Sequence, residues 1–234
     1  MHLSLVRLAG WVSHSRARGA AAALVAAGLL VAGCGAGDTS SAPATVSAAE
    51  DVGSSFRGTA LSEPMPLTDA AASAVFTTAA GGTTTLGELQ QDRVMLVFFG
   101  YTHCPDVCPT TMADLGIALQ RTPEQVQERS QVVFITSDPE RDTPAVLTDW
   151  LDHFDSGLAT PFVGLTAAPE QVTAVAESMG VSLSPPQVGP DGTVTVQHGA
   201  QTLAFVDGRA GLVWTSGSTS EDYRVDLARL VGDL

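Results

Sequence analysis

The sequence contains no lysine, and basic charge is scarce. Its 11 basic residues are all arginine and stand against 25 acidic residues, which gives 11 − 25 = −14 at pH 7. A chain that begins at Cys34 keeps eight arginines, so its charge is 8 − 25 = −17. Nucleic-acid binding needs clustered basic charge that displaces counterions from phosphates. The composition therefore argues against a nucleic-acid binder and against a polybasic membrane-surface protein.

Cysteine is also rare. Three cysteines among 234 residues are too few for a disulfide scaffold, so their positions matter more than their number. A hydrophobic share of 44% is enough for a folded core, which argues against a wholly disordered chain. The length predicts one domain, or one domain with an extension.

Acidic residues are absent before Cys34, whereas three arginines lie there. Residues 19–33 form an uncharged apolar stretch of 15 residues. That is shorter than the ~20 residues of a membrane span but typical of a signal-peptide core. It ends in Val31-Ala32-Gly33-Cys34, which resembles a bacterial lipobox; an ordinary cleavage site beside an incidental cysteine is the alternative. We expect residues 1–33 to be a signal peptide, with Cys34 lipidated on the outer face of the cytoplasmic membrane.

The segment after Cys34 is poor in residues that form a core. Sixteen of the 21 residues 35–55 are Gly, Ala, Ser, Thr or Pro, so they cannot bury enough surface to offset chain entropy. We expect residues 34–55 to be a flexible tether that spans roughly 25 Å. It would let a folded domain over residues 56–234 reach a membrane-bound client.

Seven strands are predicted in this domain. Residues 94–99 and 131–136 are nearly unbroken apolar runs, as expected of strands buried on both faces of a sheet. Gly81-Gly82 and Asp207-Gly208 are typical of hairpin turns. The predicted strands span residues 74–77, 83–86, 94–99, 131–136, 162–165, 203–206 and 212–215.

Helices are predicted over residues 110–120, 143–154 and 169–179 and after residue 218. Thr143 fits an N-cap followed by proline, and Gly180 fits the glycine that ends a helix. Ser218 with Glu221 fits a capping box for the last helix. Strands that alternate with helices predict an α/β fold, with a central, mostly parallel sheet flanked by helices.

The residues that carry chemistry follow the first buried strand. Residues 100–109 read GYTHCPDVCP, which places Cys104 and Cys108 at the start of a helix, as in the thioredoxin arrangement. A helix N-terminus lowers the pKa of a cysteine. Helical positions i and i+4 have Cβ atoms ~5–6 Å apart, whereas a disulfide needs ~3.5–4.5 Å. The spacing favours a metal between the sulfurs without excluding a disulfide, and two buried small hydrophobic residues are the simplest alternative.

Two thiolates favour Cu(I) or zinc, and a histidine is expected as the third ligand. Three histidines remain after export. We expect His153 to be a solvated helix residue, and the side chain of His103 to diverge from that of the adjacent Cys104. His198 precedes the predicted strand 203–206, and in thioredoxin-like sheets the segment entering that strand runs beside the cysteine pair. His198 is therefore the best candidate.

Four blocks of sequence, in order, resemble the Sco (SenC/PrrC) family: FFGYTHCPDVCPTTMADL, FITSDPERDTPAVLTDW, GLT, and a histidine shortly before LAFVD. The resemblance covers about three quarters of the chain. Members are thioredoxin-fold copper proteins that help metallate cytochrome c oxidase. It implies a thioredoxin-like fold. The chain departs from the family pattern at residues 181–197, a Pro- and Gly-rich stretch where we expect an inserted loop or hairpin before the histidine; the hairpin at Gly81-Gly82 is expected at the N-terminal side of the fold. The resemblance also implies copper ligation by Cys104, Cys108 and His198.

Three further residues come from the matching segments. The resemblance implies that Asp138 lies near the metal at the end of a strand and supports the site without ligating the metal, although a turn or cap carboxylate is equally compatible with the sequence. We expect Asp106 to be a charge on the motif turn and Met112 to be a core residue, rather than metal ligands.

The leading hypothesis is a copper metallochaperone that holds Cu(I) through two thiolates and Cu(II) with the help of His198. By resemblance, its client is the copper centre of cytochrome c oxidase subunit II or another extracytoplasmic copper protein. A membrane-anchored thiol–disulfide oxidoreductase that uses Cys104 and Cys108 is the alternative. A copper or redox sensor cannot be separated from these two. A peroxidase is disfavoured because no arginine lies near Cys104 in the sequence.

Overall fold

A computed structural model describes residues 55–185, 187–190, 194–232 and 234. The expected signal peptide, Cys34 and nearly all of the expected tether lie outside the described residues. Within the described part of the chain, no helix is both long enough and apolar enough to cross a membrane.

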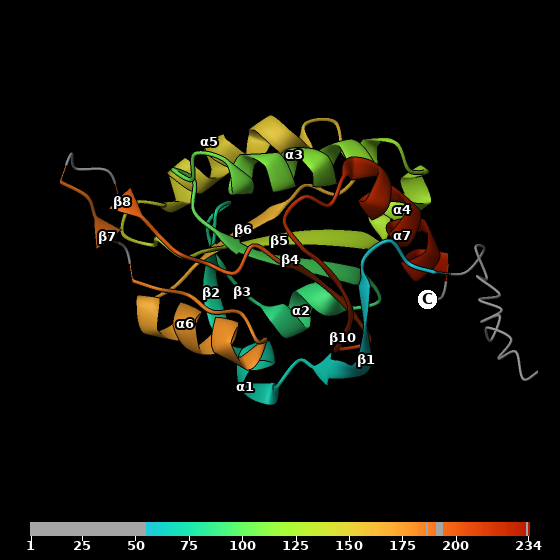
Figure 1. Ribbon diagram of the computed structural model, residues 1–234, viewed down its shortest axis with the longest axis horizontal. Coiled ribbons are helices and arrows are strands. Elements are labelled where there is room, and N and C mark those ends of the chain that lie inside the picture. The colour runs from blue at the N-terminus through green and yellow to red at the C-terminus, as the bar shows by residue number, and fades with distance from the viewer. Residues whose placement is uncertain (1–54, 186, 191–193, 233) are drawn as a thin grey trace, which may run out of the picture. The chain divides into compact units, whose positions relative to one another are not determined.

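Eight strands form one sheet in the order β1-β10-β9-β4-β5-β6-β2-β3, with helices on both faces (Figure 1). Pairing is parallel from β4 to β5 to β6 and antiparallel at every other position in this sheet. The expectation of a mostly parallel sheet is therefore wrong outside the centre, and the sheet is mixed. The reason is that the hairpins β2–β3 and β9–β10 flank the parallel centre, and β1 adds a further antiparallel strand beside β10. The strands are β1 (Thr59–Pro66), β2 (Val75–Thr78), β3 (Thr83–Thr85), β4 (Val94–Gly100), β5 (Ser130–Thr136), β6 (Val163–Thr166), β9 (Thr202–Val206) and β10 (Arg209–Trp214).

The central strands bury both of their faces, as predicted. Every residue of β4 and of β5 is buried. Because side chains alternate along a strand, Leu96 and Phe98 enter one core and Val97 and Phe99 enter the other. Helices α3 (Val107–Gln120), α4 (Glu124–Glu128), α5 (Pro144–Asp155) and α7 (Ser220–Gly232) pack on the first core. Helices α1 (Asp69–Ser73), α2 (Leu86–Gln90) and α6 (Pro169–Ser178) pack on the second.

Helix ends follow local capping chemistry. Thr143 caps α5, because its Oγ1 accepts a hydrogen bond from the backbone N–H of Val146, and Gly180 has φ +67° just after α6. Both predictions are confirmed. α3 begins at Val107, three residues earlier than predicted. The five-residue helices α1, α2 and α4 and the edge strand β1 were not predicted.

The capping box of α7 is one residue later than predicted. Asp222 Oδ2 accepts from the backbone N–H of Thr219 at 2.9 Å, and the Asp222 N–H donates to Thr219 Oγ1 at 3.4 Å. Glu221 instead accepts two hydrogen bonds from Arg224. The prediction of Ser218 with Glu221 is wrong because the pattern of a hydroxyl followed three residues later by an acid occurs twice in this stretch.

Both predicted hairpins form. β2 pairs with β3 across Gly81-Gly82, and β9 pairs with β10 across Asp207-Gly208. Asp207 and Gly208 have φ +48° and +72°, as the tight turn between two twisted strands requires. A further two-stranded hairpin, β7 (Gln187–Val188) with β8 (Val194–Thr195), lies in the predicted insertion before His198. The insertion is therefore confirmed as a hairpin.

The topology determines where the insertion returns. β9 runs antiparallel to β4, and Thr202 at its start pairs with Phe98 near the end of β4. The chain entering β9 therefore arrives where β4 ends and the GYTHCPDVCP segment begins. This arrangement brings residues 90 positions apart in the sequence into contact.

Candidate metal centre

The two cysteines of the motif lie at the N-terminus of α3. Cys104 is half-buried in the turn before the helix, and Cys108 is completely buried in its first turn. Both are free thiols. Gly100 makes room for Cys108, because a Cβ atom at this position would lie 2.8 Å from Cys108 Sγ. A larger residue at position 100 would displace the buried sulfur.

The environment gives the two thiols opposite acidities. The Cys108 thiol beside it holds the pKa of Cys104 at about 4, aided by the backbone N–H groups of Asp106 and Cys108 and opposed by burial. The Cys108 N–H lies 3.5 Å from Cys104 Sγ. Proximity to Cys104 and then burial raise the pKa of Cys108. In the metal-free protein Cys104 is therefore the thiolate, and Cys108 retains its proton.

His198 reaches the same point from the opposite side. Its Nε2 lies 3.3 Å from Cys108 Sγ, and its Nδ1 lies 3.4 Å from the carbonyl oxygen of Gly199. A hydrogen bond from Nδ1 to a carbonyl leaves the Nε2 lone pair for a metal. The ring stands edge-on to Phe98 and Tyr101, with centroids 5.8 and 5.9 Å away. These aromatic rings restrict the orientation of the imidazole.

The segment that carries His198 is itself held in place. His198 forms an isolated bridge with Leu183, the Gly199 N–H donates to the Ser182 carbonyl at 2.9 Å, and the Ser184 N–H donates to the Gln197 carbonyl at 2.8 Å. Both ends of the inserted hairpin are thus paired with each other. The position of the histidine is a property of the folded insertion.

The donor set fits a single metal ion. Cys104 Sγ, Cys108 Sγ and His198 Nε2 lie within 4.8 Å of one another. Two sulfurs that each lie ~2.3 Å from a metal are at most ~4.6 Å apart, so a small closing movement suffices. Thiolates select soft metals such as Cu(I), and imidazole suits copper and zinc. Within the described residues, this is the sole group of three or more His, Cys, Asp or Glu side chains that meets the distance requirement.

A buried carboxylate behind the motif was not singled out from the sequence. Asp142 has no exposed surface. Its Oδ2 accepts from the Thr102 N–H at 3.0 Å and from Thr136 Oγ1 at 2.6 Å, and its Oδ1 accepts from Thr102 Oγ1 at 2.6 Å. Thr136 ends β5 and pairs with Gly100. Asp142 therefore connects the motif turn to the central sheet, and its charge contributes to raising the pKa of Cys108.

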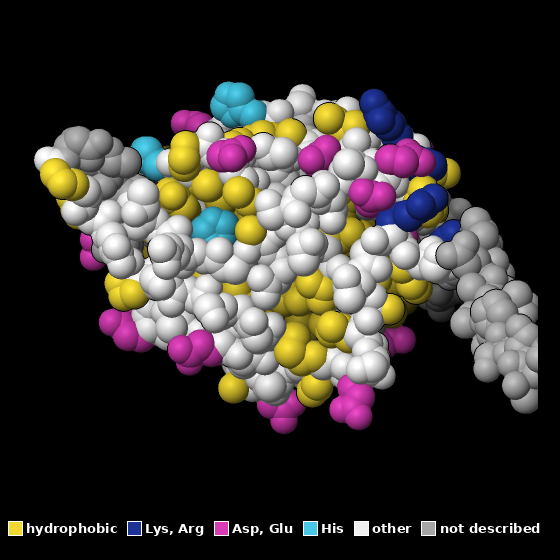
Figure 2. Space-filling view, viewed as in Figure 1, with side chains coloured by type: hydrophobic (Ala, Val, Ile, Leu, Met, Phe, Trp, Pro, Cys, Tyr) yellow, Lys and Arg dark blue, Asp and Glu magenta, His cyan; other side chains and the backbone are white. Residues whose placement is uncertain are grey.

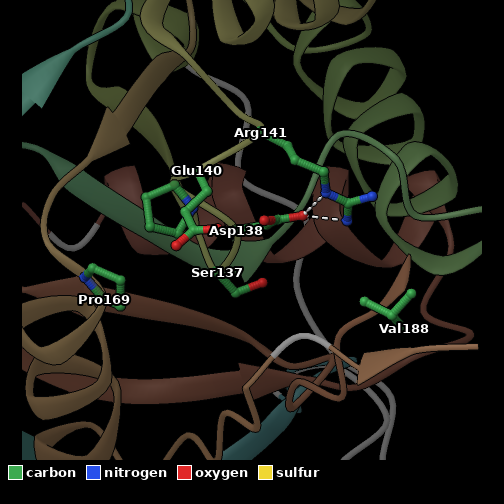
Figure 3. A pocket seen from close by; sticks show the side chains of 7 residues that line it. Ser137, Asp138, Glu140, Arg141, Pro169 and Val188 are labelled. Carbon is green, nitrogen blue, oxygen red and sulfur yellow. Dashed lines mark hydrogen bonds and ion pairs between the residues drawn. The ribbon is translucent and has the colours of Figure 1, made fainter. Parts of the chain in front are cut away.

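Asp138, the carboxylate that the sequence did single out, pairs with an arginine. It is buried, and Arg141 binds it through a hydrogen bond from Nε at 2.5 Å and an ion pair from the neighbouring nitrogen (Figure 3). The pair lies at a pocket of about 360 Å³ that Glu140 and Val188 also line. Among the described residues, no hydrogen bond joins Asp138 to the cysteines or His198. Its supporting role stays a prediction.

Four other candidates lie where the sequence suggested. Met112 is completely buried in the core under α3. Asp106 is exposed at the N-cap of α3, without a capping hydrogen bond from its side chain. His103 points to Thr102 Oγ1 at 3.0 Å and is 58% exposed, and His153 is exposed on α5. None of the four belongs to the group of converging donors.

The sequence matches a family model described as SCO1/SenC over residues 69–231. A protein of Stutzerimonas stutzeri that is named for copper binding is 33% identical to this chain over 140 residues. These residues are 60% of this chain and 62% of that protein. SenC of Rhodobacter capsulatus is 35% identical over 118 residues, or 48% of this chain and 51% of SenC. Mitochondrial SCO1 of Saccharomyces cerevisiae is 35% identical over 107 residues, or 45% of this chain and 35% of SCO1. The match therefore spans less than two thirds of each of these relatives.

Solved structures share the fold. ScoI of Bradyrhizobium japonicum with copper bound superposes with a TM-score of 0.57 at 30% identity, covering 72% of this chain and 98% of ScoI. Apo Sco1 of Thermus thermophilus superposes with a TM-score of 0.59 at 36% identity, covering 77% of this chain and 98% of Sco1. The thioredoxin-like α/β fold expected from the sequence is confirmed.

Proposed function

This chain belongs to the SCO1/SenC family of copper-binding proteins, and we propose that it is a copper metallochaperone that carries copper on Cys104, Cys108 and His198. The observation that carries this proposal is the convergence of two sulfurs and one imidazole nitrogen within 4.8 Å. Copper is the cargo of such a protein. The metal must therefore be held firmly and also be reachable by a receiving protein.

The donor set suits both oxidation states of copper. Two thiolates satisfy Cu(I), which tolerates low coordination, and the imidazole of His198 adds the harder donor that helps to hold Cu(II). Exposure differs across the set: Cys108 is completely buried, whereas Cys104 and His198 are half-buried. An incoming ligand reaches the metal from the side of Cys104 and His198, so exchange begins there.

The proposal includes a location and a client. We propose that residues 1–33 are removed, that Cys34 is lipidated, and that residues 34–55 tether the domain 56–234 to the outer face of the cytoplasmic membrane. The client is the copper centre of cytochrome c oxidase subunit II or another extracytoplasmic copper protein. Replacing Cys34 with Ser should leave a precursor or release a soluble protein with normal copper binding. Unchanged maturation and membrane association would rule out the anchor.

The test of the copper function offers copper and zinc together to the purified, reduced protein and to two histidine variants. His198→Ala should retain Cu(I) and titratable thiols but lose stable Cu(II) binding and its sulfur-to-copper charge-transfer absorption. It should also fail to support oxidase assembly in a cell that lacks the native protein. His153→Ala, a change at an exposed histidine on α5, is the matched control and should behave as wild type. Preference for zinc over copper would contradict the proposal.

One observation favours thiol–disulfide exchange as the second candidate. The pKa of Cys104 is about 4, which makes it a thiolate at neutral pH beside a protonated partner. Such a pair can attack a client disulfide and then resolve the mixed disulfide. This chemistry needs no histidine ligand. If His198→Ala supports oxidase assembly as well as wild type while Cys104→Ser does not, thiol exchange is the function.

A further inference from the structure

Tyr101 contacts all three candidate ligands of the metal centre. Its ring stands edge-on to the imidazole of His198, with centroids 5.9 Å apart. Its carbonyl oxygen accepts a hydrogen bond from the Cys104 N–H at 3.2 Å. Cys104 and burial raise the pKa of Cys108, and the N–H of Tyr101, which donates to the Cys108 sulfur, opposes this rise. A residue that touches every donor can influence a metal without binding it.

The hydroxyl of Tyr101 lies between two partners. Tyr101 exposes only 3% of its surface. Burial raises the pKa of the hydroxyl, and the backbone N–H of Val196, which donates to the phenol oxygen, opposes that rise. The second partner of the hydroxyl is the side chain of Cys104. Cys104 is the thiolate of the cysteine pair and has no proton to give, so the phenol O–H is the donor to its sulfur.

A hydrogen bond to a ligating sulfur changes the balance between the oxidation states of copper. Hydrogen bonding around a cysteine ligand is one of the factors that tune a copper potential. The sulfur gives more charge to Cu(II) than to Cu(I), so in the Cu(I) form it keeps more negative charge and accepts the stronger hydrogen bond. A hydroxyl that donates to this sulfur therefore favours Cu(I).

The surroundings of the site strengthen this hydrogen bond. On the face shown in Figure 2, hydrophobic side chains gather beside a histidine just below α3. Tyr101 and Val196 are both buried, with 3% and 5% of their surfaces exposed. In such apolar surroundings a hydrogen bond is electrostatically stronger than in water, and water does not replace it easily.

The same hydroxyl joins the sulfur to the segment that carries the histidine. Val196 lies two residues before His198. A phenylalanine at position 101 would keep the ring beside His198, but it would leave the Val196 N–H without this acceptor and the Cys104 sulfur without this donor. One substitution therefore separates the contribution of the hydroxyl from that of the ring.

We propose that Tyr101 is a positioning residue whose hydroxyl donates a hydrogen bond to the Cys104 sulfur and shifts the loaded site toward Cu(I). The statement about Cu(I) rests on the proposed function, because it assigns copper to this site. The connection from Cys104 through the hydroxyl to Val196 exists without copper.

The experiment compares Tyr101→Phe with Tyr223→Phe in the reduced full-length chain. Tyr223 is the matched control, because it is also buried and its hydroxyl shares a hydrogen bond of 3.1 Å with Thr202 instead of a metal ligand. Affinities for Cu(I) and for Cu(II) are measured by competition with chromophoric chelators. In Tyr101→Phe the affinity for Cu(I) should fall about two- to tenfold relative to that for Cu(II), which corresponds to one hydrogen bond.

The Cu(II) form gives a spectroscopic signature of the same change. Without the hydrogen bond the sulfur releases its electrons more easily, so the sulfur-to-copper charge-transfer absorption of Tyr101→Phe should move to longer wavelength. Tyr223→Phe should keep both the wild-type absorption and the wild-type ratio of affinities.

A further measurement is made on the metal-free protein. Hydrogen exchange of the Val196 amide, followed by NMR relative to the amides of β4, should be faster in Tyr101→Phe than in wild type. It should be unchanged in Tyr223→Phe, because that variant leaves the acceptor of the Val196 N–H in place. Unchanged exchange in Tyr101→Phe would refute the connection through the hydroxyl.

Two outcomes with copper would overturn the proposal. One is an unchanged ratio of Cu(I) to Cu(II) affinity in folded Tyr101→Phe. The other is an equal change in both tyrosine variants, which would show that lost stability alone is responsible. A wild-type chain that binds no copper would instead refute the proposed function and with it the statement about Cu(I), while the exchange of the Val196 amide would still test the connection to Cys104.

Discussion

Among the described residues, the carboxylates of Asp142 and Asp226 have no exposed surface, and each accepts hydrogen bonds from three donors. Asp142 accepts from the N–H and hydroxyl of Thr102 and from the hydroxyl of Thr136, behind the metal-binding motif. Asp226 accepts from the N–H groups of residues 57–58 at 2.8 to 3.0 Å and from Trp214 Nε1 at 3.0 Å.

The difference between the two lies in what their donors belong to. The donors of Asp142 are on the motif turn and the end of β5, so this carboxylate orients groups next to Cys104 and Cys108. The donors of Asp226 are on the start of the domain and on β10, so this carboxylate joins β10, α7 and the N-terminal segment. A carboxylate that is buried and accepts several hydrogen bonds is therefore not by that alone part of a functional site. We therefore expect substitutions of Asp142 and Asp226 to differ in their effects on copper affinity and on the free energy of unfolding.

The largest effect is expected from Asp226→Ala. It leaves three donors without their acceptor, and hydrogen bonds to a charged group contribute about 1.5–3 kcal/mol each. The free energy of unfolding from urea denaturation should fall by about 3 kcal/mol or more, while copper stoichiometry in the folded protein stays the same. A loss below about 1 kcal/mol, or a loss of copper from folded protein, would contradict the structural role.

The second-largest effect is expected from Gly100→Ala, next to Cys108. The added Cβ would lie 2.8 Å from Cys108 Sγ, so the sulfur or the backbone must move. Overpacking of this kind typically costs about 1–3 kcal/mol, and here it should also weaken copper binding. Gly211→Ala in β10 is the matched control, since no atom lies within 4 Å of its Cβ position. Equal copper affinity in both variants would show that Cys108 tolerates displacement.

Asp142→Asn should change the metal site more than stability. An amide whose oxygen takes the place of Oδ2 keeps the bonds from the Thr102 N–H and Thr136 Oγ1, but it removes the charge and puts an NH₂ group opposite Thr102 Oγ1. Removing a group that orients metal ligands typically costs about 10–100-fold in affinity or activity, and we expect copper affinity to fall within that range. Asp226→Asn is the paired control and should leave copper affinity unchanged. If both variants lose affinity equally, the distinction between the two carboxylates is lost.

The smallest effect is expected from Asp138→Asn. Asp138 binds Arg141, and among the described residues it makes no hydrogen bond to Cys104, Cys108 or His198. Cu(II) binding or transfer should weaken by no more than about tenfold, and 1:1 binding of Cu(I) should persist. Complete loss of Cu(I) from a folded variant would contradict a supporting role.

The sequence predicted the elements whose signals are local. Strand β4 is an apolar run and β5 has an apolar centre, and Thr143 and Gly180 mark helix ends by their own chemistry. The short helices α1, α2 and α4 have five residues each, too few to display a helical period. The direction of the strands near the sheet edges depends on the strand beside which each hairpin pairs. No pattern in the strands themselves encodes it.

The residues of the candidate metal centre also divide into those with a local sequence signal and those without one. Cys104 and Cys108 were identified from their spacing, and His198 from its place before β9. Asp142 was missed because the stretch DPERD contains three acids, Asp138, Glu140 and Asp142. The choice between them depends on which side chain turns toward Thr102 and Thr136, and that follows from how the chain leaves β5. Tyr101, whose ring packs against His198 and whose pKa is raised by burial, gave no signal beyond its place in the motif.

The contacts of Asp226 also have a mechanical consequence. The Ser55 carbonyl accepts a hydrogen bond from Arg229, and the N–H groups of Arg57 and Gly58 bind Asp226; Arg229 and Asp226 are both on α7. A pull on the chain ahead of Ser55 is therefore borne first by α7 and then by the pairing of β1 with β10 at the edge of the sheet. Strand β4 lies two strands further in, behind β9. If Cys34 anchors the chain as proposed, these contacts bear the tension before it can reach the strand that positions the cysteines.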